Sequence, residues 1–138
     1  MMRTTAPGET RGPDTDTTTA TILVVDDDLP VLEVACKALS RSGYDVLRAS
    51  SGREALDVVR DAGPDIDLLL TDVVMPEMSG RELAEAARDL LPDLPVLYMS
   101  AYTEDEVILE GVRVAEVDFL AKPFSVQELV EAVETTLG

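Results

Sequence analysis

Reactive side chains in this sequence stand directly after short apolar runs. The runs cover residues 22–25, 68–70, 95–99 and 117–121, and they are followed by Asp26 and Asp27, by Asp72, by Ser100 and by Lys122. Several carboxylates in one pocket repel one another, so such a group favours a bound proton or cation. A hard divalent ion such as Mg²⁺ takes oxygen ligands. Carboxylates, a metal ion, an amine and a hydroxyl together can hold a phosphoryl group, and an aspartate can attack it as a nucleophile.

This chemistry requires the residues to converge, and the surrounding elements predict that they do. The apolar runs have the length and composition of buried strands, and a shorter alternating strand is predicted at 44–49. A Ser or Thr followed three residues later by Glu marks four helix starts, at 51–54, 79–82, 103–106 and 125–128, while Pro30 and Gly43 bound an earlier helix. Strands and helices that alternate five times predict an α/β domain with a five-stranded parallel, doubly wound sheet and helices on both faces. The carboxyl ends of such strands share one edge, where ligands bind.

Each of these residues also has an ordinary structural explanation. The acidic run at 26–28 suits a helix amino terminus, where negative charge is favourable. Asp72 and Ser100 belong to residue types that are common in turns, and Lys122 could be a surface lysine. The chain has only two lysines, however, and this one directly follows a predicted buried strand. Four such coincidences at one sheet edge favour a shared site.

Composition narrows the classes of function. There are 11 Lys and Arg against 28 Asp and Glu, a formal net charge of −17, which opposes direct binding to nucleic acid or to an anionic membrane. The chain has no His, which excludes His-based catalysis and a phosphohistidine within it, and it has no glycine-rich nucleotide loop. The single cysteine, Cys36, cannot form an internal disulfide and is expected in the core.

Two further expectations concern location and domain limits. The sequence has no apolar run of membrane-spanning length and no signal peptide, so we expect a cytoplasmic protein. Residues 1–20 are rich in Thr, Pro, Gly and Asp and are predicted to be a disordered tail or linker. The remaining residues, 21–138, are predicted to form one domain.

Four motifs, in this order and spacing, resemble those of the receiver (response-regulator) domains of two-component phosphorelay systems. They are VVDD at 24–27, TDVVMPEMSG at 71–80, SA at 100–101 and KPF at 122–124. The resemblance covers residues 21–138 and implies a flavodoxin-like (βα)5 fold. It implies Asp72 as phosphoacceptor, Mg²⁺ held directly by Asp27, Asp72 and the backbone carbonyl of Val74 and mainly through water by Asp26, and phosphoryl contacts from Ser100, Lys122 and the backbone N–H of Ala101.

The resemblance also implies how such a domain signals. Ser100 and Phe119 would form the switch pair, and because many relatives have Tyr where this chain has Phe119, a hydroxyl hydrogen bond there is absent. In receivers that reset quickly, the positions of Val74 and Tyr102 are often polar, so slow loss of the phosphoryl group is expected here.

The implied partner is a histidine kinase or a histidine phosphotransfer protein that serves as phosphodonor. Partner exchange usually involves the helix after Thr103, the strand at 117–121 and the last helix. A monomer or a weak phosphorylation-dependent dimer is expected. The sequence is most similar to receivers at the carboxyl end of hybrid sensor kinases. The domain is expected not to be an enzyme, beyond catalysing its own phosphorylation and dephosphorylation.

Two alternatives remain open at this point. A metal-dependent phosphatase that uses an aspartyl nucleophile wants a second acid two residues later, where this chain has Val74. A pseudoreceiver that only binds partners would be expected to lack the acid pair or the lysine, and this chain has both. Turnover of a phosphate ester would favour the first alternative, and failure to accept phosphate from acetyl phosphate would favour the second.

Overall fold

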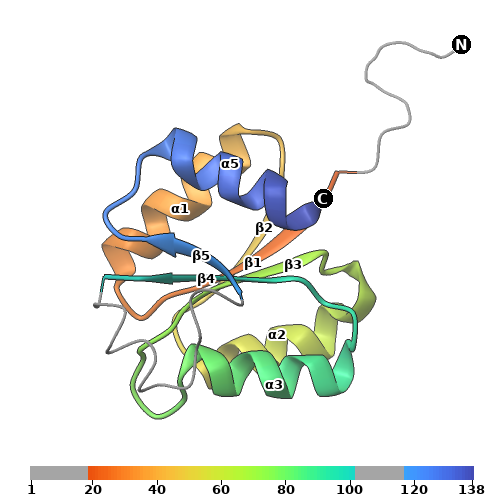
Figure 1. The fold of residues 1–138 in the computed structure, drawn as a ribbon. Helices are drawn as coiled ribbons and strands as arrows, with labels where there is room; N and C mark the ends of the chain where they lie inside the picture. The colour runs from red at the N-terminus through yellow and green to blue at the C-terminus, as the bar shows by residue number, and fades with distance from the viewer. Residues whose placement is uncertain (1–18, 102–116) are drawn as a thin grey trace, which may run out of the picture.

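The chain folds around a five-stranded parallel sheet in the computed structural model, which describes residues 19–101 and 117–138. The strand order is β2-β1-β3-β4-β5 (Figure 1). The strands are β1 (Thr21–Val25), β2 (Asp45–Ala49), β3 (Leu68–Asp72), β4 (Val96–Ser100) and β5 (Asp118–Ala121). The helices are α1 (Leu29–Arg41), α2 (Gly52–Ala62), α3 (Gly80–Leu90) and α5 (Val126–Leu137). The predicted parallel α/β architecture is confirmed, while the helix predicted after Thr103 lies outside the described residues.

Helices cover both faces of the sheet, with α1 and α5 on one side and α2 and α3 on the other (Figure 1). Alternate residues of each strand therefore enter different cores. In β1, Ile22 and Val24 pack on the α1/α5 side, whereas Leu23 and Val25 pack on the α2/α3 side. Because neither face meets water, the central strands are continuous apolar runs with no polar alternation.

The predicted helix starts are mostly confirmed. Complete capping boxes open α3 at Ser79 and α5 at Ser125. At α2 the prediction is half wrong. The Ser51 hydroxyl accepts a hydrogen bond from the Glu54 N–H, but the Glu54 carboxylate accepts from the backbone N–H and hydroxyl of Ser50. Ser50 thus offers two donors to the carboxylate that a full box would direct to Ser51.

The turns that follow α1 and α2 differ in form. Gly43 has a φ of +98° directly after α1, as a helix-ending glycine requires. Helix α2 ends at Ala62, and one turn of 3₁₀ helix, η2 (Gly63–Asp65), follows it before β3. The predicted limits of the tail and domain stay predictions, since residues 1–18 lie outside the described part of the chain.

The connection from β3 to α3 is tightly constrained. Glu77 has a φ of +71°, and the Met78 N–H donates to the Pro76 carbonyl at 2.7 Å, which is the rare, strained form of γ-turn. A Cβ atom on Gly80 would lie 2.1 Å from the backbone carbonyl oxygen of Asp72. The start of α3 is therefore pressed against the end of β3, and only glycine fits at residue 80.

Candidate functional site

Three carboxylates meet at the carboxyl edge of the sheet. Asp26 and Asp27 follow β1, and Asp72 ends the neighbouring strand β3. Each offers an oxygen atom, and these atoms all lie within 4.8 Å of one another. Asp26 is fully buried and Asp72 is 5% exposed, while Asp27 is exposed to solvent. The predicted convergence of these three residues is confirmed.

The buried charge of Asp26 is fully partnered. Its Oδ1 atom accepts the backbone N–H of Asp28 at 2.9 Å, and its Oδ2 atom accepts Lys122 Nζ at 2.6 Å. A carboxylate with no exposed surface needs such partners, because an unpaired buried charge is strongly unfavourable. Asp28 itself caps α1 by accepting the N–H of Val31, so the ordinary explanation of the acidic run holds for its third member.

Lys122 joins the two buried carboxylates. Its Nζ atom also lies 3.6 Å from Asp72 Oδ2, and its backbone N–H donates to the Ser100 carbonyl, which ties the end of β5 to β4. Burial lowers the pKa of Lys122, but the hydrogen bond that Lys122 donates to Asp26 and the charge of Asp72 outweigh it, so the pKa is raised overall. The amine therefore stays charged in the site.

Asp72 lacks enough positive charge around it. Burial raises its pKa to about 7, the charges of Asp26 and Asp27 act in the same direction, and Lys122 opposes them. Its Oδ1 atom accepts the N–H of Val73 at 3.0 Å. One amine faces three carboxylates, so the cluster has oxygen ligands and surplus negative charge for a hard divalent cation, and this donor set fits Mg²⁺.

The other predicted site residues lie at or near this edge. Ser100 ends β4 beside β3 and is 1% exposed, and Ala101 follows it at the surface. Val74 is half-buried two residues beyond Asp72. Phe119 lies two residues before the end of β5, half-buried against the core on the α2/α3 side. The structure thus places Ser100 at the same edge of the sheet as the carboxylates and Lys122. Phe119 lies further back along its strand, inside the sheet.

An apolar surface beside the site was not predicted. A hollow of about 580 Å³ opens next to the site, lined by Asp28, Pro30, Val31, Val34, Ala101, Lys122, Pro123 and Phe124. Leu29 and Val34 are 56% and 58% exposed on the adjoining part of α1. Neither belongs to the set that α1 buries, which is Leu32, Ala35, Cys36, Ala38 and Leu39.

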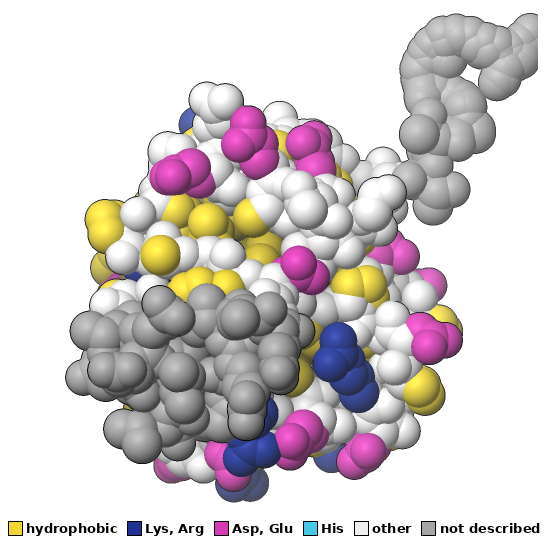
Figure 2. All heavy atoms as spheres, in the orientation of Figure 1, with side chains coloured by type: hydrophobic (Ala, Val, Ile, Leu, Met, Phe, Trp, Pro, Cys, Tyr) yellow, Lys and Arg dark blue, Asp and Glu magenta, His cyan; other side chains and the backbone are white. Residues whose placement is uncertain are grey.

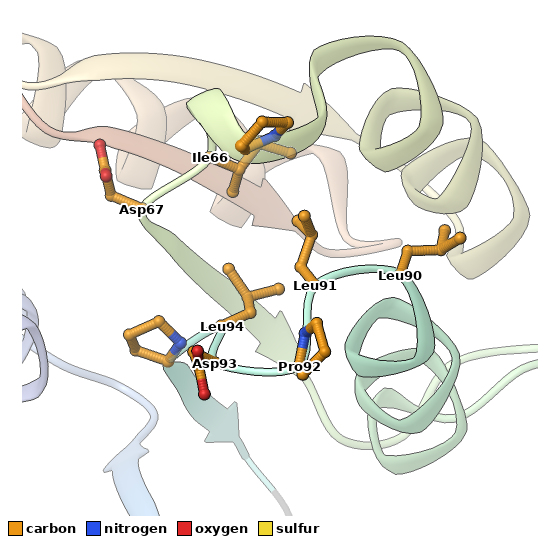
Figure 3. A pocket seen from close by; sticks show the side chains of 9 residues that line it. Ile66, Asp67, Leu90, Leu91, Pro92, Asp93 and Leu94 are labelled. Atoms are coloured by element: carbon orange, nitrogen blue, oxygen red, sulfur yellow. The ribbon is translucent and has the colours of Figure 1, made fainter.

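Another hollow, of about 340 Å³, lies at the opposite edge of the sheet (Figure 3). Ile66, Leu91 and Leu94 gather around it, and Asp67 and Asp93 stand at its rim. It contains none of the residues that carry the chemistry described above.

Among the described residues on the face drawn in Figure 2, acidic side chains are scattered and form no single patch. None of the described helices is long and apolar enough to cross a membrane.

Comparison with known proteins gives a consistent result. Residues 22–134 match the sequence model of the response regulator receiver domain family. The sensor kinase CckA of Brucella abortus is 38% identical over 118 residues, which cover 86% of this chain and 12% of that protein. The transcriptional regulatory protein ZraR of Escherichia coli is 39% identical over 117 residues, 85% of this chain and 26% of that protein. The chain therefore spans a small part of these relatives.

Solved structures agree with the sequence matches. The chemotaxis protein CheY4 of Vibrio cholerae superposes with a TM-score of 0.76 at 31% identity, covering 86% of this chain and 99% of that one. The receiver domain of the hybrid histidine kinase CckA gives a TM-score of 0.73 at 36% identity, covering 86% and 100%. These likenesses confirm the flavodoxin-like fold predicted from the motifs.

Proposed function

Because the chain belongs to the response regulator receiver family, whose members are phosphoacceptor domains of two-component systems, we propose that Asp72 accepts a phosphoryl group from a phosphohistidine on a partner protein. The observation that carries this assignment is the position of Asp72 between two further carboxylates and Lys122. An Asp72 carboxylate oxygen would attack phosphorus as the P–N bond to the donor histidine breaks. The imidazole leaves and takes up a proton.

The other residues of the site have distinct roles in this transfer. Lys122 and the Ser100 hydroxyl would contact the phosphoryl oxygens, together with the backbone N–H of Ala101, and so stabilise the charge that develops on them. Asp26, Asp27, Asp72 and the carbonyl of Val74 would hold Mg²⁺. The ion would supply charge neutralisation between the carboxylates and the incoming phosphoryl group. Ser100 and Phe119 would then act as the switch pair.

The direct test uses acetyl phosphate, a small donor, in the presence of MgCl₂. Intact-mass measurement should show one added phosphoryl group per chain. No addition would favour the pseudoreceiver. Steady hydrolysis of a generic phosphate ester would favour the phosphatase, which the apolar side chain of Val74 already disfavours because it cannot act as a general acid.

Mg²⁺ is expected to stabilise the fold, and Asp27→Ala is expected to weaken this effect. The ion relieves repulsion among Asp26, Asp27 and Asp72, and at ten times its Kd a ligand adds about 1.4 kcal/mol to the free energy of unfolding. That corresponds to a rise of roughly 5 °C in the melting temperature of a domain this size. Thermal melts with and without MgCl₂ test this, and an unchanged wild-type midpoint would count against the metal site.

The apolar surface around the hollow at α1 is expected to contact the phosphodonor, because the donor must bring its phosphohistidine to Asp72, beside this surface. Val34→Glu is therefore expected to slow phosphotransfer from a phosphorylated histidine kinase or phosphotransfer protein by on the order of tenfold, since it places a charge in an apolar contact. Labelling by acetyl phosphate should not change. If both donors are slowed alike, Val34 affects the site itself and the donor does not bind there.

The phosphorylated state is expected to decay slowly. Hydrolysis needs a water placed in line behind phosphorus, and Val74 offers that water no hydrogen bond. Tyr102, the other position that often places water, lies outside the described residues. The Val74→Asn/Tyr102→Glu variant should lose its phosphoryl group on the order of tenfold faster, measured by intact mass after removal of donor. Equal decay rates in the variant and the wild type would show that another group orients the water.

The wider setting of this domain is also part of the proposal. The chain spans only 12% and 26% of two curated relatives, and those proteins carry further parts. We propose that it serves as a receiver in the cytoplasm, either alone or within a larger protein, and that signal removal depends on a partner phosphatase or on back-transfer to histidine. Phosphotransfer profiling against the host's histidine kinases would identify the donor.

A further inference from the structure

The strained turn at Glu77 must be held by its surroundings. A residue other than glycine at a φ of +71° is strained and persists only where neighbouring structure fixes it. Two such contacts are present. The Gly80 N–H donates to the Val73 carbonyl at 2.8 Å, which closes the connection at its base. The second contact is the packing of Met78 on the start of α2.

Met78 occupies the space where α2 begins. A Cβ atom on Gly52 would lie 2.6 Å from Met78 Sδ and 2.9 Å from its Cβ and Cγ atoms, so the side chain lies directly on the Gly52 backbone. Met78 also packs against the core on the α2/α3 side. Its remaining surface borders a hollow of about 480 Å³ lined by Arg53, Leu56, Asp57 and Arg60. The packing of Met78 on Gly52 therefore links the turn to the start of α2.

The turn and the site belong to one short stretch of backbone. Val74 follows Asp72 by two residues and precedes Glu77 by three. The Val73 N–H donates both to the Met99 carbonyl and to Asp72 Oδ1, so its position is fixed by the sheet. Val74 is the first residue beyond that anchor, and the direction of its carbonyl depends on how the rest of the connection is held.

We propose that Met78, seated on Gly52, is a positioning residue that holds the strained turn and thereby aims the Val74 carbonyl at the cation site. This inference rests on the proposed function, because it takes Val74 as a ligand of Mg²⁺. Met78 does not touch the ion or the phosphoryl group. It acts through the backbone, as residues outside the ligand set do when they orient ligands.

The test measures the Kd for Mg²⁺ by isothermal titration calorimetry with MgCl₂ on the full chain. Met78→Ala removes the side chain from Gly52 and should weaken binding roughly tenfold. Met78→Leu keeps most of the volume and should bind as wild type does. Gly52→Ala puts a methyl group where Met78 lies and should weaken binding as well.

A double variant separates positioning from general loss of packing. Glycine adopts a φ of +71° without strain, so Glu77→Gly lets the turn form without help from Met78. Met78→Ala/Glu77→Gly should therefore recover most of the affinity that Met78→Ala loses. Val133→Ala provides the control, because it removes buried volume from α5 on the other face of the sheet. It should lower the melting temperature and leave the Kd for Mg²⁺ unchanged.

Three results would contradict the inference in distinguishable ways. Wild-type affinity in Met78→Ala would overturn the role of Met78 and leave the metal site standing. Weaker binding in Val133→Ala to the same degree would show that any loss of stability weakens the site. Absence of Mg²⁺ binding by wild type would overturn the proposed metal site itself, and the inference with it.

Discussion

Replacing Asp72 by asparagine is expected to abolish phosphorylation and to give a domain that is more stable than wild type at neutral pH. Asparagine is nearly the same shape but has no carboxylate oxygen to attack phosphorus. The substitution also removes one of three mutually repelling charges at the sheet edge, and it leaves Lys122 bound to Asp26 at 2.6 Å. Loss of reactivity is thus expected without loss of fold.

The measurement is intact mass after incubation with acetyl phosphate and MgCl₂, together with a thermal melt. Asp93→Asn serves as the control, because Asp93 lies at the opposite edge of the sheet beside the hollow of Figure 3. That variant should gain one phosphoryl group as wild type does. A labelled Asp72→Asn protein would show that another residue is the acceptor.

The stability difference should depend on pH. The pKa of Asp72 in the folded chain is raised from 3.8 to about 7 by burial and by the neighbouring carboxylates. The folded state therefore binds this proton more tightly than the unfolded chain does. The contribution of the bound proton to the free energy of unfolding is fully present below pH 4 and is lost as pH rises through 7. Asp72→Asn has no such loss. Its advantage, without divalent cations, should grow from pH 5 to pH 8 by roughly 1–3 kcal/mol. Denaturant unfolding at the two pH values checks this.

Gly80→Ala is expected to destabilise the domain by about 2–3 kcal/mol, because overpacking against a fixed backbone forces the chain to move. The added Cβ atom would lie 2.1 Å from the Asp72 carbonyl oxygen, so either α3 or the end of β3 has to shift. A shift of β3 moves the phosphoacceptor. The variant should therefore also be phosphorylated more slowly under conditions in which it remains folded.

Gly43→Ala is the matched comparison. Gly43 has a φ of +98° but no atom within 4 Å of an added Cβ, so that substitution carries only the conformational cost of a left-handed residue, about 1 kcal/mol. Urea unfolding of both variants and their rates of labelling by acetyl phosphate make the comparison. Equal losses of stability, with equal labelling, would mean that the contact between Gly80 and Asp72 relaxes at no cost.

The sequence predicted the fold well where burial leaves a continuous signal. Strands β1, β3 and β4 are apolar because helices cover both faces of the sheet, and their ends were placed within one or two residues. The site followed from topology alone, since parallel strands that alternate with helices bring their carboxyl ends to one edge. The meeting of Asp26, Asp27, Asp72 and Lys122 required no further information.

The details that escaped prediction depend on competition between neighbours. The capping box at Ser51 failed because Ser50 offers two donors to the carboxylate of Glu54, and residue types alone do not rank these partners. The positive φ of Glu77 could not be predicted, because a glutamate at that position carries no sign of a left-handed backbone.

The contact between Lys122 and Asp26 joins residues that are 96 positions apart in the chain. Closing a loop of this length has an entropic cost that must be met before the contact can form, so we expect it to form late in folding. Because Lys122 follows β5, the last strand in the chain, the contact between Lys122 and Asp26 can form only once β5 has joined the sheet. For the same reason, phosphoryl incorporation during refolding would count fully native molecules and ignore partly folded ones.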